Sequence, residues 1–143
     1  MKKYLLIVFL ALPIAAHADV SSEAFCFTSG GAKPTNFEMH TYYNASVNFS
    51  SGFIKYQNSK DMIPLVFADS TTETLSKDTP DEATTTWLEV FGGQVTGEYE
   101  MTSQGTSVVS MTYTSRKEGG KKGFLLNADM IEDGSCKWQY AKQ

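Results

Sequence analysis

Apolar and polar side chains alternate along residues 97–115, the period-two pattern of a half-buried β-strand. The alternation is interrupted once, by a short polar run with a glycine at residues 103–106. Two alternating segments joined by such a run predict a β-hairpin. The side chains expected to face the core are Tyr99, Met101, Val109, Met111 and Tyr113. Those expected to form the exposed tip are Ser103, Gln104, Gly105 and Thr106.

Similar short segments recur along the chain, while helix signals are scarce. Threonine, serine, tyrosine, phenylalanine and valine dominate them, and turn residues separate them at short intervals. About eight strands are expected, at residues 24–29, 36–43, 52–58, 62–70, 84–91, 97–103, 107–115 and 123–127, with residues 136–140 as a candidate ninth. The pattern predicts an all-β fold, a single antiparallel barrel or sandwich that occupies residues 19–143.

Three features interrupt or separate these strands. Pro64 lies inside an apolar run and cannot donate a ladder hydrogen bond, so its strand is expected at an edge or with a bulge. Residues 71–83 are polar and predict a long exposed loop, or a short helix that begins near Pro80. The charged, glycine-rich run at residues 116–123 predicts a second exposed loop.

The first 18 residues have the pattern of a secretory signal peptide. Lys2 and Lys3 precede an apolar run at residues 4–15, and small residues follow up to Ala18. The short Met-Lys-Lys start is typical of a bacterial export signal, so a periplasmic or secreted protein that begins at Asp19 is expected. Of the 12 basic residues, two lie in this segment, so ten remain against 16 acidic residues and the net charge becomes −6.

This charge bears on the class of partner. Arg116 is the only arginine, and an acidic chain with one arginine is unsuited to binding nucleic acid phosphates. An acidic surface is compatible with a basic protein partner, although net charge also serves solubility alone.

The two cysteines, Cys26 and Cys136, lie near opposite ends of the exported chain. In an oxidising compartment they are expected to form one disulfide, which in the chain-entropy model contributes roughly 4–5 kcal/mol. Phe25 and Phe27 flank Cys26 and point to the opposite face of its strand. Either the two rings fill the core and Cys26 lies outside, or both faces of this strand are covered.

No pattern typical of an active site is present. His40 is the one histidine after residue 18, it alternates with apolar positions, and no nucleophile-elbow motif accompanies it. Glu98 and Glu100 share a strand face opposite the predicted core, so a solvated pair is favoured over a glycosidase pair. Asp78, Asp81 and Glu82, in the predicted loop at residues 71–83, lack the spacing of a calcium-binding loop. We therefore expect a protein that is not an enzyme and has no metal or cofactor.

The aromatic residues leave one alternative open. Tyr42, Tyr43, Trp87 and Trp138 could together form a sugar-stacking surface, although aromatic residues at strand spacing usually pack in a core. A barrel can also enclose a small-ligand cavity, and the sequence does not distinguish such a cavity from a filled core.

Two segments resemble the C-type lysozyme inhibitor family. "FCFTSGG" is similar to that family's opening cysteine and glycine turn, and "TGEYEMTSQGTSVV" is similar to its Ser-Gly-x-x-Tyr segment, with Thr96 in the place of the serine and Tyr99 one residue closer. The resemblance implies an exported eight-stranded antiparallel barrel that inserts a segment into a lysozyme cleft. Periplasmic immunity proteins against secreted cell-wall toxins look similar at this level.

The sequence therefore predicts a protein that binds and inhibits a toxic or cell-wall-degrading enzyme through loops held by rigid strands. The residues expected to contact this partner are Ser103, Gln104, Gly105 and Thr106 at the hairpin tip, and Asp78, Asp81 and Glu82 in the acidic loop. One alternative is an exported barrel that binds a small ligand or a glycan, and another is a hydrolase with an unrecognised site.

Overall fold

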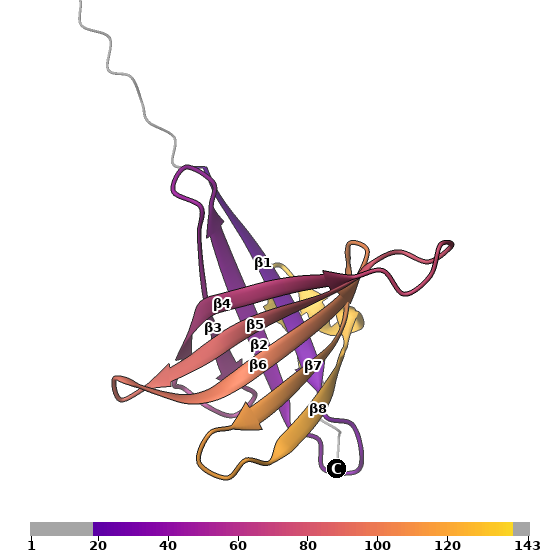
Figure 1. Ribbon diagram of the computed structural model, residues 1–143. Helices are drawn as coiled ribbons and strands as arrows, with labels where there is room; N and C mark the ends of the chain where they lie inside the picture. Colours follow the sequence, from indigo (N-terminus) through magenta and orange to yellow (C-terminus); the bar gives the residue numbers. More distant parts are fainter. Residues whose placement is uncertain (1–18, 139–143) are drawn as a thin grey trace, which may run out of the picture.

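The chain forms a closed antiparallel barrel of eight strands, each paired with its neighbours in sequence (Figure 1). The computed structural model describes residues 19–138. The strands are β1 (Val20–Thr28), β2 (Asn36–Asn44), β3 (Phe49–Tyr56), β4 (Ile63–Glu73), β5 (Glu82–Phe91), β6 (Gln94–Gln104), β7 (Ser107–Ser115) and β8 (Lys121–Leu126). The predicted all-β class is confirmed, and the architecture is a barrel rather than a sandwich. The predicted signal peptide and Tyr140 lie outside the described residues.

Alternation along the strands fills the middle of the barrel with aromatic and aliphatic side chains. The buried apolar cluster consists of Phe27, Phe37, Met39, Ile54, Leu65, Trp87, Tyr99, Met111 and Phe124. Phe37 lies at its centre, with ring centroids 5.2 Å from Phe27, 5.7 Å from Tyr99 and 4.9 Å from Phe124. Edge-to-face and stacked contacts at these distances stabilise the core beyond simple burial.

The hairpin of β6 and β7 confirms most of the predicted core positions and corrects one. Tyr99 and Met111 are buried, while Met101 and Tyr113 are half-buried against the core. Val109 was predicted to be a core residue, but its side chain is 41% exposed. The pairing of β6 with β7 shifts register at this point, so β7 holds an extra residue and the alternation changes phase. As a result, Val108 packs against the core instead.

Strands β4 and β5 are longer than predicted. They remain paired out to Glu73 opposite Glu82, so the segment that leaves the sheet is residues 74–81 and contains no helix. The helix that the sequence offered near Pro80 is therefore absent. Pro64 lies opposite Phe53 of β3, before pairing with β5 begins at Leu65, so it occupies a local edge as predicted.

The predicted disulfide between Cys26 and Cys136 is present, with Cα atoms 5.7 Å apart. Cys136 belongs to a small sheet outside the barrel, formed by β9 (Ile131–Glu132) and β10 (Ser135–Cys136) after the 3₁₀ helix η1 (Ala128–Met130). Cys26 and Phe27 are both fully buried, although they point to opposite faces of β1. Of the two arrangements left open by the sequence, the one with both faces covered is correct.

Within residues 19–138 the one helix is η1, and no helix is long and apolar enough to cross a membrane.

The C-terminal segment is anchored to the barrel by two hydrogen bonds in addition to the disulfide. The Asn127 backbone N–H donates to the Cys26 carbonyl at 2.7 Å, and the Cys136 N–H donates to Glu38 Oε2 at 3.2 Å.

Candidate functional site

The two segments predicted to bind a partner lie side by side at one end of the barrel. The loop between β4 and β5 projects away from it, and the turn between β6 and β7 lies against the base of this loop (Figure 1). The Gly105 N–H donates to the Asp81 carbonyl at 3.0 Å, and Gln104 pairs with Glu82 in the sheet register. We name residues 73–82 and 103–106 together the acidic protrusion.

A glycine is required where the turn meets the loop. Gly105 has φ +59°, which other residues rarely adopt, and a Cβ there would lie 3.3 Å from Cβ of Pro80. The loop is also bonded within itself, because Thr74 Oγ1 donates to Asp81 Oδ1 at 2.7 Å. The protrusion is therefore a hydrogen-bonded unit rather than two independent loops.

Five of the seven predicted contact residues are exposed. Asp78, Asp81, Gln104, Gly105 and Thr106 are accessible to solvent. Ser103 and Glu82 are half-buried strand residues, and Ser103 Oγ lies 3.5 Å from the Ala83 carbonyl. These two residues therefore form the base of the protrusion rather than its tip.

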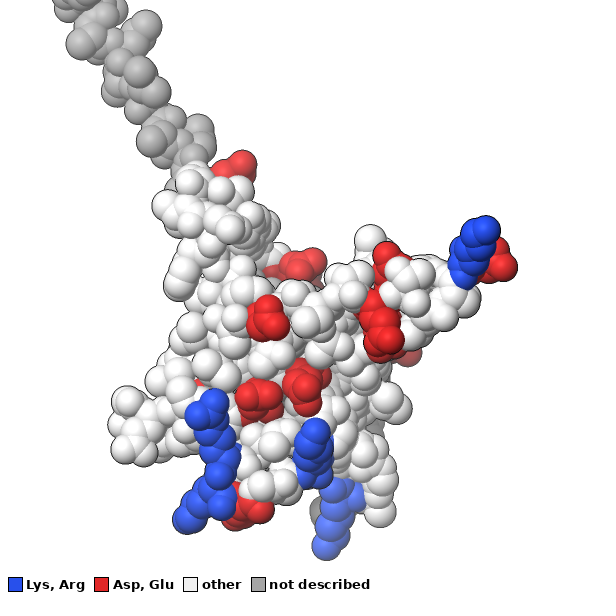
Figure 2. Space-filling model, viewed as in Figure 1, with Lys and Arg blue, Asp and Glu red and all other residues white. Residues whose placement is uncertain are grey.

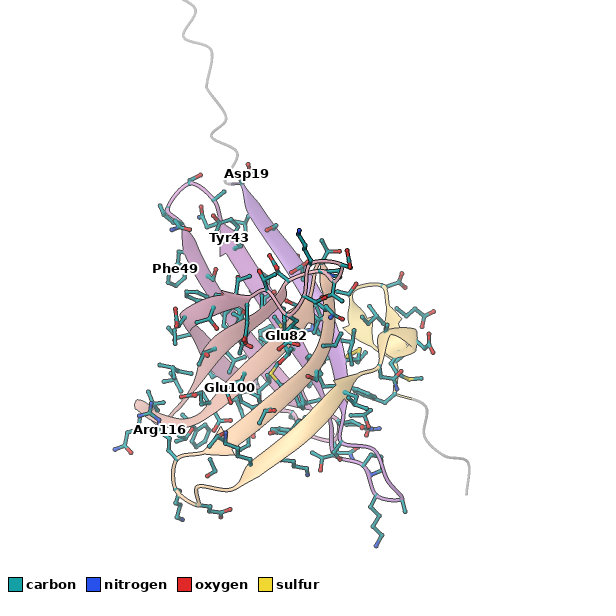
Figure 3. The ribbon with its side chains drawn as sticks, turned by 45° about the vertical axis from the view of Figure 1, so that its right-hand side comes forward. Asp19, Tyr43, Phe49, Glu82, Glu100 and Arg116 are labelled. Carbon is teal, nitrogen blue, oxygen red and sulfur yellow. A yellow bond between two sulfur atoms is a disulfide. The ribbon has the colours of Figure 1, made fainter. Side chains whose placement is uncertain are left out.

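Charge is separated between the two ends of the barrel. In the acidic protrusion Glu73, Asp78, Asp81 and Glu82 outnumber Lys77. The loops and strand starts at the opposite end carry Lys33, Lys60, Arg116, Lys117, Lys121 and Lys122 against Asp61 and Glu118. Figure 2 shows basic side chains gathered at the lower end and acidic ones above and to the right, and Figure 3 shows Arg116 toward the end opposite Asp19. The acidic end is the one that carries the protrusion.

The residues considered for catalysis lie apart on the outer wall. The His40 ring stacks on Phe53, with centroids 4.7 Å apart, and its Nε2 lies 3.9 Å from Glu38 Oε1. Glu100 lies 4.0 Å from the Lys121 ammonium, on the face opposite buried Tyr99. Among residues 19–138 no group of three His, Cys, Asp or Glu side chains could hold a metal ion.

A buried carboxylate that sequence reasoning missed lies inside the opposite end of the barrel. Glu89 is 7% exposed and accepts hydrogen bonds from Thr96 Oγ1 at 2.6 Å, Tyr99 OH at 3.1 Å and Tyr113 OH at 3.2 Å. A further contact joins the Tyr99 and Tyr56 hydroxyls at 2.8 Å. The signal was present in the sequence, because Glu89 shares strand parity with Trp87, an inward-facing residue.

This cluster, named here the Glu89 network, places three tyrosine hydroxyls in a site that disfavours their ionisation. Burial, and after it the neighbouring Glu89 carboxylate, raise the pKa of the Tyr113 hydroxyl to about 12. Burial also raises the pKa values of Tyr56 and Tyr99 above the ordinary value of 10.0. The hydroxyls therefore stay neutral donors, which suits a structural network.

The raised pKa values of these tyrosine hydroxyls predict how the free energy of unfolding changes at alkaline pH. Below about pH 10 the folded and unfolded chains hold these tyrosine protons equally, so the stabilisation is complete. As pH rises from about 10 towards 12, the unfolded chain releases protons that the folded chain keeps, and the free energy of unfolding falls. Urea unfolding at about pH 9 and about pH 11 should show a smaller loss for Tyr113→Phe than for the wild type. Equal losses in both proteins would contradict the shift.

Comparisons of the chain with protein-family models, curated proteins and solved structures find no match.

Proposed function

We propose that the protein is a non-catalytic inhibitor that binds a basic, cell-wall-degrading enzyme through the acidic protrusion. The observation that carries the proposal is the hydrogen bond between Gly105 and Asp81, which joins two exposed segments into one projecting unit on a rigid barrel. A projecting unit of this kind can enter a cleft and block it without an acid, base or metal of its own.

Electrostatics support a basic target. Asp78 and Asp81 are exposed, and Lys77 is the one basic residue of the protrusion. Complementary charge speeds the encounter of two proteins and orients it. The basic side chains at the far end of the barrel would be repelled by the same target, so the protrusion would meet it first.

The compartment forms part of the proposal. The Cys26–Cys136 disulfide is compatible with an oxidising environment, and the pattern of residues 1–18 is that of an export signal. We place the protein in the periplasm or outside the cell, where enzymes that degrade the cell wall act. An immunity protein against a secreted effector would use the same surface.

Charge reversal of the protrusion tests this function. The wild type is expected to suppress lysis of bacterial cells by a basic C-type lysozyme at near-equimolar ratio. The double variant Asp78→Lys, Glu82→Lys is expected to lose at least about tenfold in inhibitory affinity, because two attractive charges become repulsive ones. The measurement is the lysis rate against inhibitor concentration, with affinity confirmed by calorimetry.

A matched control carries the same charge change elsewhere. Asp129→Lys, Glu132→Lys alters two exposed acids of the C-terminal segment and is expected to retain inhibition within about threefold. Equal losses in both double variants would assign the effect to net charge and would contradict a site at the protrusion. Absence of inhibition by the wild type against a panel of lysozymes and other wall hydrolases would overturn the function itself.

A further inference from the structure

The interior of the barrel is hollow at the end that carries the acidic protrusion. A cavity of about 190 Å³ opens there among residues of β1 to β6. Trp87, 4% exposed, is its most deeply buried lining residue, whereas Tyr43 and Phe67, which also line it, are 41% and 40% exposed. The cavity therefore runs from a solvent-accessible aromatic rim down to the edge of the core.

Short side chains account for this opening. The same strand faces that carry Phe27, Met39 and Ile54 in the core carry Ser21, Thr41 and Ser50 nearer the rim. These three residues line the cavity and are too small to meet across the barrel. A volume of about 190 Å³ corresponds to about six water molecules at roughly 30 Å³ each, which is room for a small organic molecule.

The lining has one sign of charge. Glu23 is the single charged residue among the lining side chains, and it forms no ion pair with another described residue. Four of the lining residues are aromatic, namely Tyr42, Tyr43, Phe67 and Trp87. Phe67 and Trp87 pack edge to face, with their ring centroids 5.8 Å apart and their planes at 82°. Perpendicular rings beside a carboxylate are the chemistry by which proteins hold organic ammonium groups.

A polar atom of the wall supports a bound molecule with an acceptor. The indole Nε1 of Trp87 is buried and has no hydrogen-bond partner among the described residues. Buried indole N–H groups normally find an acceptor, so this donor is an exception that calls for one.

We propose that this cavity binds a small organic cation. Its ammonium group packs against the aromatic side chains of Phe67 and Trp87 that line the cavity, with the Glu23 carboxylate as counter-charge. The site goes beyond the inhibitory function and does not depend on it, because the exposed residues of the protrusion, among them Asp78 and Gln104, are not part of the lining.

Tryptophan fluorescence provides a direct test. In a Trp138→Phe background Trp87 is the only tryptophan, so its emission reports on the cavity alone. Choline is the probe, and 3,3-dimethyl-1-butanol, in which carbon replaces the charged nitrogen, is its neutral match. We expect a saturable change with choline and binding of the neutral match at least about fivefold weaker, from the loss of the cation–π and ionic contributions.

Two matched variants locate the charge. Glu23→Gln is expected to weaken choline binding about fivefold, whereas Glu98→Gln, on the outer wall, should leave it unchanged. A lack of saturable response to choline overturns the proposal. It is also overturned if the neutral match binds equally well, or if both glutamate variants weaken binding to the same extent.

The same ammonium chemistry could come from a free amine or from a lysine side chain of a docked protein. Titration with Nα-acetyl-lysine amide beside choline distinguishes the two sources by which of them binds more tightly. The Asp78→Lys, Glu82→Lys variant should retain choline binding while it loses inhibition, so failure of the cavity and failure of the inhibitory function are separate results.

Discussion

Replacement of Cys26 and Cys136 together by alanine is expected to lower the free energy of unfolding by about 4–5 kcal/mol. The two residues are 110 positions apart, so the bond removes a large loop-closure entropy from the unfolded chain. It also holds the β9–β10 sheet over the outer face of β1, where Cys26 is fully buried. The measurement is urea unfolding followed by tryptophan fluorescence.

The control for this change is the wild type unfolded in the presence of a reductant. It should match the double alanine variant to within about 1 kcal/mol, since both lack the cross-link. A destabilisation of less than about 1 kcal/mol in the variant would contradict the view that the disulfide stabilises the fold by reducing the entropy of the unfolded chain.

The change Glu89→Ala is expected to cost roughly 3–5 kcal/mol of stability. It removes the acceptor of three hydroxyl groups, those of Thr96, Tyr99 and Tyr113, and leaves them buried or half-buried without a partner. Truncation also leaves a void beside the core. Thermal and urea unfolding at neutral pH measure the loss.

Two comparison variants separate the network from the loss of a carboxylate. Glu98→Ala, on the outer wall of the next strand, should change stability by less than about 0.5 kcal/mol. Tyr56→Phe removes one hydroxyl at the end of the network and should cost about 1 kcal/mol. If Glu89→Ala cost no more than Tyr56→Phe, the network would not be a major source of stability.

Period-two alternation predicted the eight barrel strands, because the side-chain direction in a strand depends only on local geometry. It was wrong for the candidate ninth strand at residues 136–140, because residues 137 and 138 lie outside any strand. It failed at Val109, where an extra residue in β7 changes the phase, and a bulge has no reliable signal in an alternating sequence. It also ended β4 too early, because Thr71, Thr72 and Glu73 form a strand exposed on both faces and resemble a loop in composition.

The arrangement of the candidate site depends on contacts that no local pattern contains. The sequence predicted that Gln104 and Asp78 lie in exposed segments, but not that those segments touch. Their proximity follows from the register of β5 against β6, which pairs Glu82 with Gln104. Glu89 was overlooked for a related reason. Its three hydrogen-bond donors lie on other strands, Thr96 and Tyr99 on β6 and Tyr113 on β7, and no local pattern places them around one carboxylate.

The seam between β1 and β8 is the narrowest junction of the barrel. It contains two residue pairs, Phe27 with Leu126 and Thr28 with Leu125. These pairs join strands that lie near opposite ends of the described chain. Contacts of such large sequence separation form slowly, because the whole intervening chain must first be ordered. Until they form, the eight strands are an open sheet with two free edges, and free edges pair with other chains. We therefore expect the yield of folded protein to depend on the rate at which the two thiols form the disulfide relative to the rate at which the free edges aggregate.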